Sequence, residues 1–255
     1  MKRIVMLLIL GLTGSMIFAM VTWAEELDET FDAGFDQWEI LDEPDANSAP
    51  SNWQVVPDVA GHANVLSPKS NIYGGDAGAF EPSRGTWAAY QDGDWADAIF
   101  QVDMHFTDDD VPGVAFRWMD ENNHYIFDLM QQARGDKEAF KRLRKVVDGT
   151  YTELAIVHDG GYDKDVWYTA RIEYSGSNIK IFWDNELLLE VEDNEPGLMG
   201  GTVVLSSWGM TDVFFDNISV NLTTAVEPAG KLSQLWGAIK AGLQLPYFPS
   251  KMPGR

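Results

Sequence analysis

The sequence predicts an all-β sandwich of antiparallel sheets, on three observations. Short segments rich in β-branched and aromatic residues recur about every eight to twelve residues, with turn-forming residues between them. Several of these segments alternate apolar and polar side chains, as strands with one buried face do. The chain has no cysteine, so burial of apolar side chains must hold the sandwich together, and a chain of this length can bury enough of them.

The first half of the predicted sandwich is a series of short strands. A first edge strand contains Phe35, Trp38 and Ile40, and the Asp-, Pro- and Asn-rich residues 42–51 form a loop. The clearest alternation is at residues 98–106, where every second side chain is apolar. The remaining strands are predicted at residues 52–56, 65–66, 70–73 and 86–90.

A hairpin is predicted at residues 113–131. Its first arm, residues 113–119, is apolar and aromatic, and its second arm, residues 124–131, returns to similar residues. The four polar residues 120–123 between the arms favour a turn, because Asx side chains hydrogen-bond to their own backbone. The later strands are predicted at residues 140–147, 151–158, 167–174, 178–183, 187–191, 203–207 and 213–220.

The two ends of the chain differ from the predicted sandwich, residues 25–222. Residues 1–24 have a basic start, an apolar run and small residues before Ala24, which predicts a secretory signal peptide and a periplasmic, secreted or cell-surface protein. The alternative is a retained membrane anchor. Residues 223–255 form a basic tail, in which apolar residues of 232–243 share one face of a predicted helix. We expect this helix to pack on the sandwich, to lie on an anionic membrane or to be recognised by an export or surface-attachment system.

The charge of the chain excludes one class of partner. The formal net charge is −22, and all of the acidic residues lie within residues 25–227, so the predicted sandwich carries nearly all of the negative charge. An acidic surface repels nucleic acid and anionic lipid. We therefore expect no nucleic-acid partner, and membrane contact through the basic tail alone.

Several segments of the chain resemble a known family. These segments are residues 107–110, 113–117, 120–125, 200–203 and 215–220. Together they resemble the C-terminal lectin-like domain of thrombospondins, and residues 181–186 resemble the wider concanavalin A-like and laminin G-like group. The resemblance covers residues 28–222 and implies a jelly-roll sandwich that binds glycans or proteins, with a role in cell adhesion and often with calcium.

Two groups of carboxylates are candidate calcium ligands, because calcium takes several oxygen ligands. Asp108, Asp109 and Asp110 are consecutive and precede the predicted hairpin. The second group pairs Asp216, on the last predicted strand, with Asp28 and Glu29 near the start of the sandwich. The resemblance to jelly rolls implies that first and last strands meet there. The alternative for both groups is a solvated acidic cluster.

Aromatic residues and arginines are candidates for glycan binding, because sugar sites combine stacking faces with planar polar groups. The aromatic candidates are Trp118, Tyr125, Trp183 and Trp208, and the polar candidates are Arg117, Arg142 and Arg144. The alternatives are that the aromatic residues fill the core, that the basic strand at residues 140–147 binds acidic sugars such as uronates, and that each arginine pairs with a carboxylate of the chain.

No catalytic motif is recognisable in the sequence. The Glu-x-Asp-x-Glu strand of jelly-roll glycosidases, a nucleophile elbow and a phosphate-binding loop are all missing from it. We therefore predict a non-catalytic module that binds carbohydrate or extracellular matrix, with structural calcium. The alternatives are a glycan-active hydrolase and a purely structural surface protein.

Overall fold

The computed structural model describes residues 5–9, 17–21, 27–44, 46–74, 85–131, 138–195 and 197–222. Within these residues the secondary structure consists of strands, so no helix there is long and apolar enough to cross a membrane. The predicted helix at residues 232–243 lies outside the described residues.

The strands agree with the prediction of an all-β fold. Their bounds are β1 (Val5–Ile9), β2 (Ile17–Val21), β3 (Leu27–Glu29), β4 (Trp38–Asp42), β5 (Gln54–Val59), β6 (His62–Ser67), β7 (Thr86–Tyr90), β8 (Ala98–Phe106), β9 (Val111–Asp120), β10 (Asn123–Met130), β11 (Phe140–Val147), β12 (Thr150–Val157), β13 (Trp167–Ser175), β14 (Asn178–Trp183), β15 (Glu186–Glu192), β16 (Thr202–Trp208) and β17 (Val213–Leu222). Strands β1 and β2 pair with each other within the predicted signal peptide.

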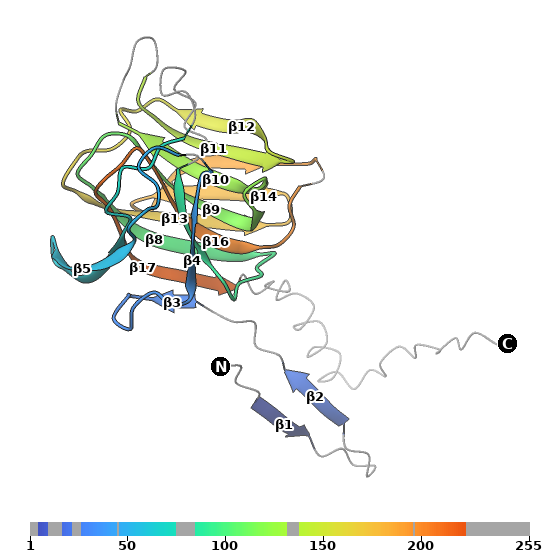
Figure 1. The fold of residues 1–255 in the computed structure, drawn as a ribbon. Coiled ribbons are helices and arrows are strands. Elements are labelled where there is room, and N and C mark those ends of the chain that lie inside the picture. Colours follow the sequence, from blue (N-terminus) through green and yellow to red (C-terminus); the bar gives the residue numbers. More distant parts are fainter. Residues whose placement is uncertain are drawn as a thin grey trace. The chain divides into compact units, whose positions relative to one another are not determined.

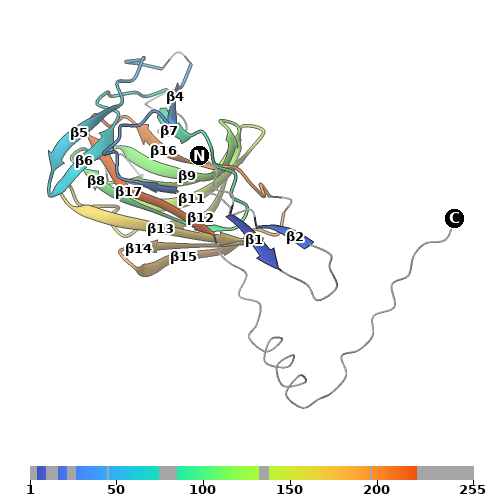
Figure 2. The same ribbon diagram turned by 90° about the horizontal axis from the view of Figure 1, so that it is seen from below.

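Two antiparallel sheets stack face to face and form the predicted sandwich (Figures 1 and 2). The seven-stranded sheet has the order β12-β11-β10-β9-β16-β7-β4, and the eight-stranded sheet has the order β15-β14-β13-β8-β17-β6-β5. The first short strand β3 pairs with the last strand β17, with Asp28 opposite Ser219. The first and last strands of the sandwich therefore lie side by side, as the resemblance to jelly rolls implies.

The core lies between the sheets and follows the alternation in the sequence. On β8 the apolar side chains Phe100, Val102, Met104 and Phe106 are fully buried between the sheets, whereas Gln101 and Asp103 lie on the other face. Because β8 contributes every second side chain to the core, a one-residue shift in its pairing would expose the apolar set, so hydrophobic burial fixes the register of this strand.

A β-bulge in β9 changes which face its last residues occupy. Ala115 is opposite Val204 of β16 and Trp118 is opposite Thr202, so β9 has one more residue than its partner between these pairs. Arg117, within the bulge, has a φ of 46°, in the left-handed region. Phe116 therefore faces the core, whereas Trp118 packs on the outer face of the seven-stranded sheet, which is turned away from the eight-stranded sheet.

Candidate functional site

The outer face of the seven-stranded sheet carries an apolar cluster of its own, apart from the core. This cluster consists of Trp87, Ala89, Ala115, Trp118, Ile126 and Val204. The rings of Trp87 and Trp118 have centroids 5.8 Å apart, and His124 stacks on Trp118 at 4.4 Å. Trp87 and Trp118 are 1% and 5% exposed, so this cluster is packed into the outer face, and a ligand can reach only the small part of it that lines a hollow.

A hollow of about 430 Å³ lies beside this cluster. Its lining residues are Glu39, Leu41, Ala89, Tyr90, Gln91, Gly93, Trp118, Met119, Asp120, Glu121 and Thr202. Trp118, which is 5% exposed, gives it an aromatic wall of which little is open to solvent, and Met119, 63% exposed, adds apolar surface. The Asp120 carboxylate accepts hydrogen bonds from Asn122 and Asn123 in its own turn. Glu39, Gln91 and Glu121 remain as polar groups around the wall. We call this hollow the Trp118 hollow.

A buried ion-pair cluster lies on the same sheet face, on β10 and β11. Asp128 accepts two hydrogen bonds from Arg142, at 3.1 and 3.0 Å, and a further one from Arg144. The two guanidinium groups also lie over the rings of Phe140 and Tyr151. Asp128 is 1% exposed. Arg142 and Arg144, two of the predicted ligand residues, therefore pair with a buried carboxylate of the chain, which is the alternative given above for each arginine.

Arg117 and Tyr125 lie inside the sandwich, not on the outer face. The Arg117 guanidinium, 1% exposed, donates to the backbone oxygens of Ala96, Gly176 and Leu198. The Tyr125 hydroxyl donates to Asp193 at 2.8 Å, and burial together with this carboxylate raises the pKa of Tyr125. We therefore do not include these two predicted ligand residues in the candidate site.

Trp208 is also buried, 6% exposed, at the other end of the outer face. Its indole Nε1 donates to the Gly74 backbone oxygen at 3.3 Å, and its ring lies edge-on to Tyr73. Trp183, the fourth aromatic candidate, stacks on Tyr168 and packs against the core. Of the four aromatic candidates, Trp118 alone lines the Trp118 hollow.

The triple Asp sequence is part of a tight connection between β8 and β9. The Tyr162 hydroxyl donates to the backbone oxygens of Asp108 and Asp110, at 3.2 and 2.8 Å. Burial, and then the three carboxylates, raise the pKa of Tyr162. Oδ1 of Asp109 forms an ion pair with Nζ of Lys164 at 3.7 Å. Within the described part of the chain, no three His, Asp or Glu side chains converge as metal ligands.

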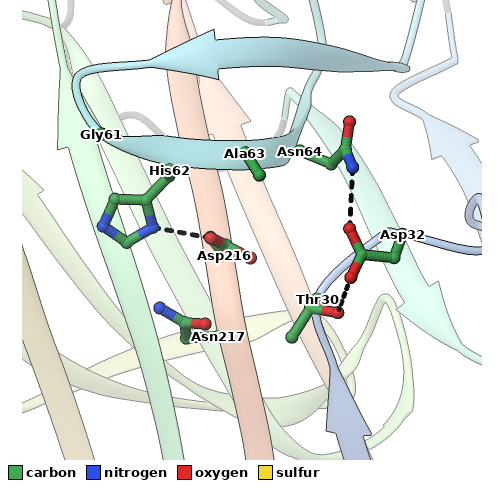
Figure 3. A pocket seen from close by; sticks show the side chains of 8 residues that line it. All are labelled: Thr30, Asp32, Gly61, His62, Ala63, Asn64, Asp216 and Asn217. Carbon is green, nitrogen blue, oxygen red and sulfur yellow. Dashed lines mark hydrogen bonds and ion pairs between the residues drawn. The ribbon is translucent and has the colours of Figure 1, made fainter.

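Asp216 lines a second pocket, of about 390 Å³, at the end of the eight-stranded sheet (Figure 3). Its Oδ2 lies 2.6 Å from His62 Nδ1, so one carboxylate oxygen is already hydrogen-bonded. Asp28 pairs with β17 through its backbone and is not among the lining residues. Calcium requires six to eight oxygen ligands, so this pair falls short of the expected set, and calcium binding stays a prediction.

Local sequence could not reveal the Asp216 pocket, whose lining residues come from three separate segments. They are Thr30, Asp32, Gly61, His62, Ala63, Asn64, Asp216 and Asn217. His62 and Asp216 are 154 residues apart in the chain. The signal that pointed here was the predicted meeting of first and last strands, which identified Asp216 but not its partner.

The fold and the two pockets define a β-sandwich with an aromatic site on its outer face and a polar site at its edge. Residues 26–221 match the family of 3-keto-alpha-glucoside-1,2-lyase-like domains, so this chain belongs to that family. No curated protein matches the chain. The resemblance to thrombospondins stays a prediction.

Solved structures with a similar fold include a Bacillus subtilis protein of galectin-like fold, with 12% identity and a TM-score of 0.52 over 75% of this chain and 91% of that one. This likeness confirms the concanavalin A-like jelly-roll sandwich. The carbohydrate-binding module CBM66 from Bacillus subtilis has 15% identity and a TM-score of 0.49 over 70% and 98% of the two chains. A Caenorhabditis elegans galectin has 16% identity and a TM-score of 0.38, over 49% and 82%.

Proposed function

We propose that this chain is an exported carbohydrate-binding domain that binds a neutral sugar in the Trp118 hollow without catalysing a reaction. The observation that carries the proposal is the aromatic wall of Trp118 on the outer sheet face, with carboxylate and amide side chains around it. The family description, which refers to a glucoside, supports a sugar as the ligand.

The chemistry of the hollow suits a sugar. A pyranose ring has an apolar face that packs on an aromatic ring, and hydroxyls around its edge that bond to polar side chains. Trp118 offers the ring, and Glu39, Gln91 and Glu121 offer acceptors for hydroxyl protons. Among the described residues that line the hollow there is no Lys or Arg, so the acidic side chains disfavour uronates and sulfated sugars.

A glycan array that includes neutral α-glucosides tests the proposal first. We expect retention of at least one neutral glycan, and a calorimetric titration with that glycan then measures the affinity. Replacing Trp118 with alanine is expected to weaken binding about tenfold or more, equivalent to at least about 1.4 kcal/mol, because the stacking surface is lost. Trp118→Phe, which keeps an aromatic ring, should bind better than Trp118→Ala.

Trp118 is buried, so the alanine variant also loses packing, and an exposed residue provides the matched test. Glu39→Gln is expected to weaken binding several-fold at unchanged melting temperature, whereas Glu186→Gln, on β15 of the other sheet, leaves the affinity unchanged. Equal affinity in all four variants, or no retention of any neutral glycan, would show that the hollow is not a sugar site.

Export is the second part of the proposal, and it rests on the signal-like composition of residues 1–24. We expect the mature protein to begin at Glu25, after cleavage at Ala24, when the chain is expressed in a bacterium with a secretion system. N-terminal sequencing of the purified protein measures this directly. A mature protein that still begins with Met1 would contradict cleavage and favour the anchor interpretation.

Catalysis on a keto-sugar is the second candidate function, and the family description favours it. Removal of the proton at carbon 2 of a 3-keto-glucoside, followed by loss of the group at carbon 1, needs a base beside the bound sugar. Nuclear magnetic resonance of a 3-keto-glucoside incubated with the full chain distinguishes the two functions. Binding without release of the carbon 1 group supports the non-catalytic proposal, and its release supports catalysis.

A further inference from the structure

The carboxylate of Asp216 is buried with one oxygen unpaired. Asp216 is 5% exposed, and its Oδ2 interacts with Nδ1 of His62 at 2.6 Å. A carboxylate accepts but does not donate, so Nδ1 must carry the proton of this hydrogen bond. The other oxygen, Oδ1, is buried and has no hydrogen-bond partner among the described residues. A buried charged oxygen without a donor is costly, so this atom indicates a ligand that donates to it.

The pocket around Asp216 is lined mainly by polar side chains of the chain (Figure 3). Asp32, from the segment after β3, accepts from Asn64 at 2.7 Å and from Thr30 at 3.3 Å. Asn217 donates its amide to Asp103 at 2.8 Å, and its amide oxygen is a further acceptor. The lining thus combines two carboxylates with amide and hydroxyl groups, and no Lys or Arg is among the lining residues.

The occupant must be cationic, and the pocket is larger than an ion. Two carboxylates without a lining Lys or Arg disfavour an anion. A volume of about 390 Å³ is the size of a small-molecule site, and no three metal-ligating side chains converge within the described residues. A protonated amine attached to a polar, hydroxyl-bearing body fits both the charge and the size.

We propose that the Asp216 pocket is a second ligand site, separate from the Trp118 hollow, that binds the protonated amine of an amino sugar. The ammonium group donates to Oδ1 of Asp216 in a charge-assisted hydrogen bond. The sugar hydroxyls bond to the polar side chains of Asp32, Asn64 and Asn217. His62, bonded to the other oxygen, holds the Asp216 carboxylate in place.

Calorimetric titration of the full chain with D-glucosamine, N-acetyl-D-glucosamine and D-glucose tests this site. We expect glucosamine to bind about tenfold or more tightly than the two uncharged sugars, since they lack the ammonium group. Asp216→Asn keeps the shape but removes the charge, so it should weaken glucosamine binding by about tenfold or more, and Asp32→Asn by a smaller factor. Asp58→Asn, at an exposed carboxylate on β5 outside the pocket, is the matched control and should leave binding unchanged.

Three results would overturn the proposal. The first is equal binding of the three sugars, and the second is glucosamine binding that Trp118→Ala abolishes but Asp216→Asn and Asp32→Asn leave intact. The third is calcium that displaces glucosamine and raises the melting temperature of the native chain but not of Asp216→Asn, which would make the pocket a metal site. Glucosamine binding that survives Trp118→Ala separates this site from the proposed sugar site, so either proposal can fail alone.

Discussion

Replacing Asp128 with alanine is expected to lower the free energy of unfolding by about 3–5 kcal/mol, the cost of removing one partner of a buried ion pair. Asp128 is 1% exposed and accepts hydrogen bonds from both Arg142 and Arg144. Without this carboxylate, the guanidinium groups of Arg142 and Arg144 both lose the negative charge with which they pair. Urea unfolding of the two proteins measures the change as a lower midpoint at unchanged slope.

Asp120→Ala is the control for this measurement. Asp120 is exposed and accepts hydrogen bonds within its own turn, so its loss should cost about 1 kcal/mol or less. If Asp128→Ala also lost less than about 1 kcal/mol, the ion-pair cluster would not hold β10 and β11 together as the contacts indicate.

Arg117→Leu is expected to have an effect of similar size, about 4 kcal/mol, for a different reason. The Arg117 guanidinium is 1% exposed and is the donor for backbone oxygens of three segments, at Ala96, Gly176 and Leu198. Leucine fills part of the space but donates nothing, so three acceptors lose a hydrogen bond. Thermal and urea unfolding should both report the loss.

Arg171→Leu is the matched control, because Arg171 lies on the outer face of the eight-stranded sheet, over the Phe182 ring and beside Glu173. An ion pair that solvent reaches contributes little, so we expect a loss below about 1 kcal/mol. Equal losses in the two arginine variants would contradict the role of Arg117 as an internal donor to the three segments.

The strands could be predicted from sequence because their signal is local. Alternation predicts a strand at residues 98–106, and the structure has β8 there. The polar residues 120–123 predict a turn, and the structure connects β9 to β10 there. The faces of the strands could not always be predicted. The bulge at Arg117 reverses the alternation, so Phe116 packs in the core and Trp118 on the outer face.

The candidate sites could be predicted in part. Trp118 is one of the aromatic candidates, but the sequence does not distinguish it from Tyr125 and Trp208, which do not line the Trp118 hollow. The sequence does not distinguish an arginine that faces solvent from one that donates to three backbone oxygens. Only the burial of Arg117 in the structure shows that it lies inside the sandwich. His62 and Asp216 meet through pairing of distant strands, which a single sequence does not show.

The central claim, a sugar site in the Trp118 hollow, is tested most directly by the indole N–H resonance of Trp118 in a ¹⁵N-labelled chain. Trp118→Phe assigns this resonance by removing it. We predict that titration with the neutral glycan retained on the array shifts the Trp118 resonance with the same dissociation constant as the calorimetric titration, while the Trp167 indole on the eight-stranded sheet does not move. A titration that leaves Trp118 unmoved while the glycan binds would contradict the account.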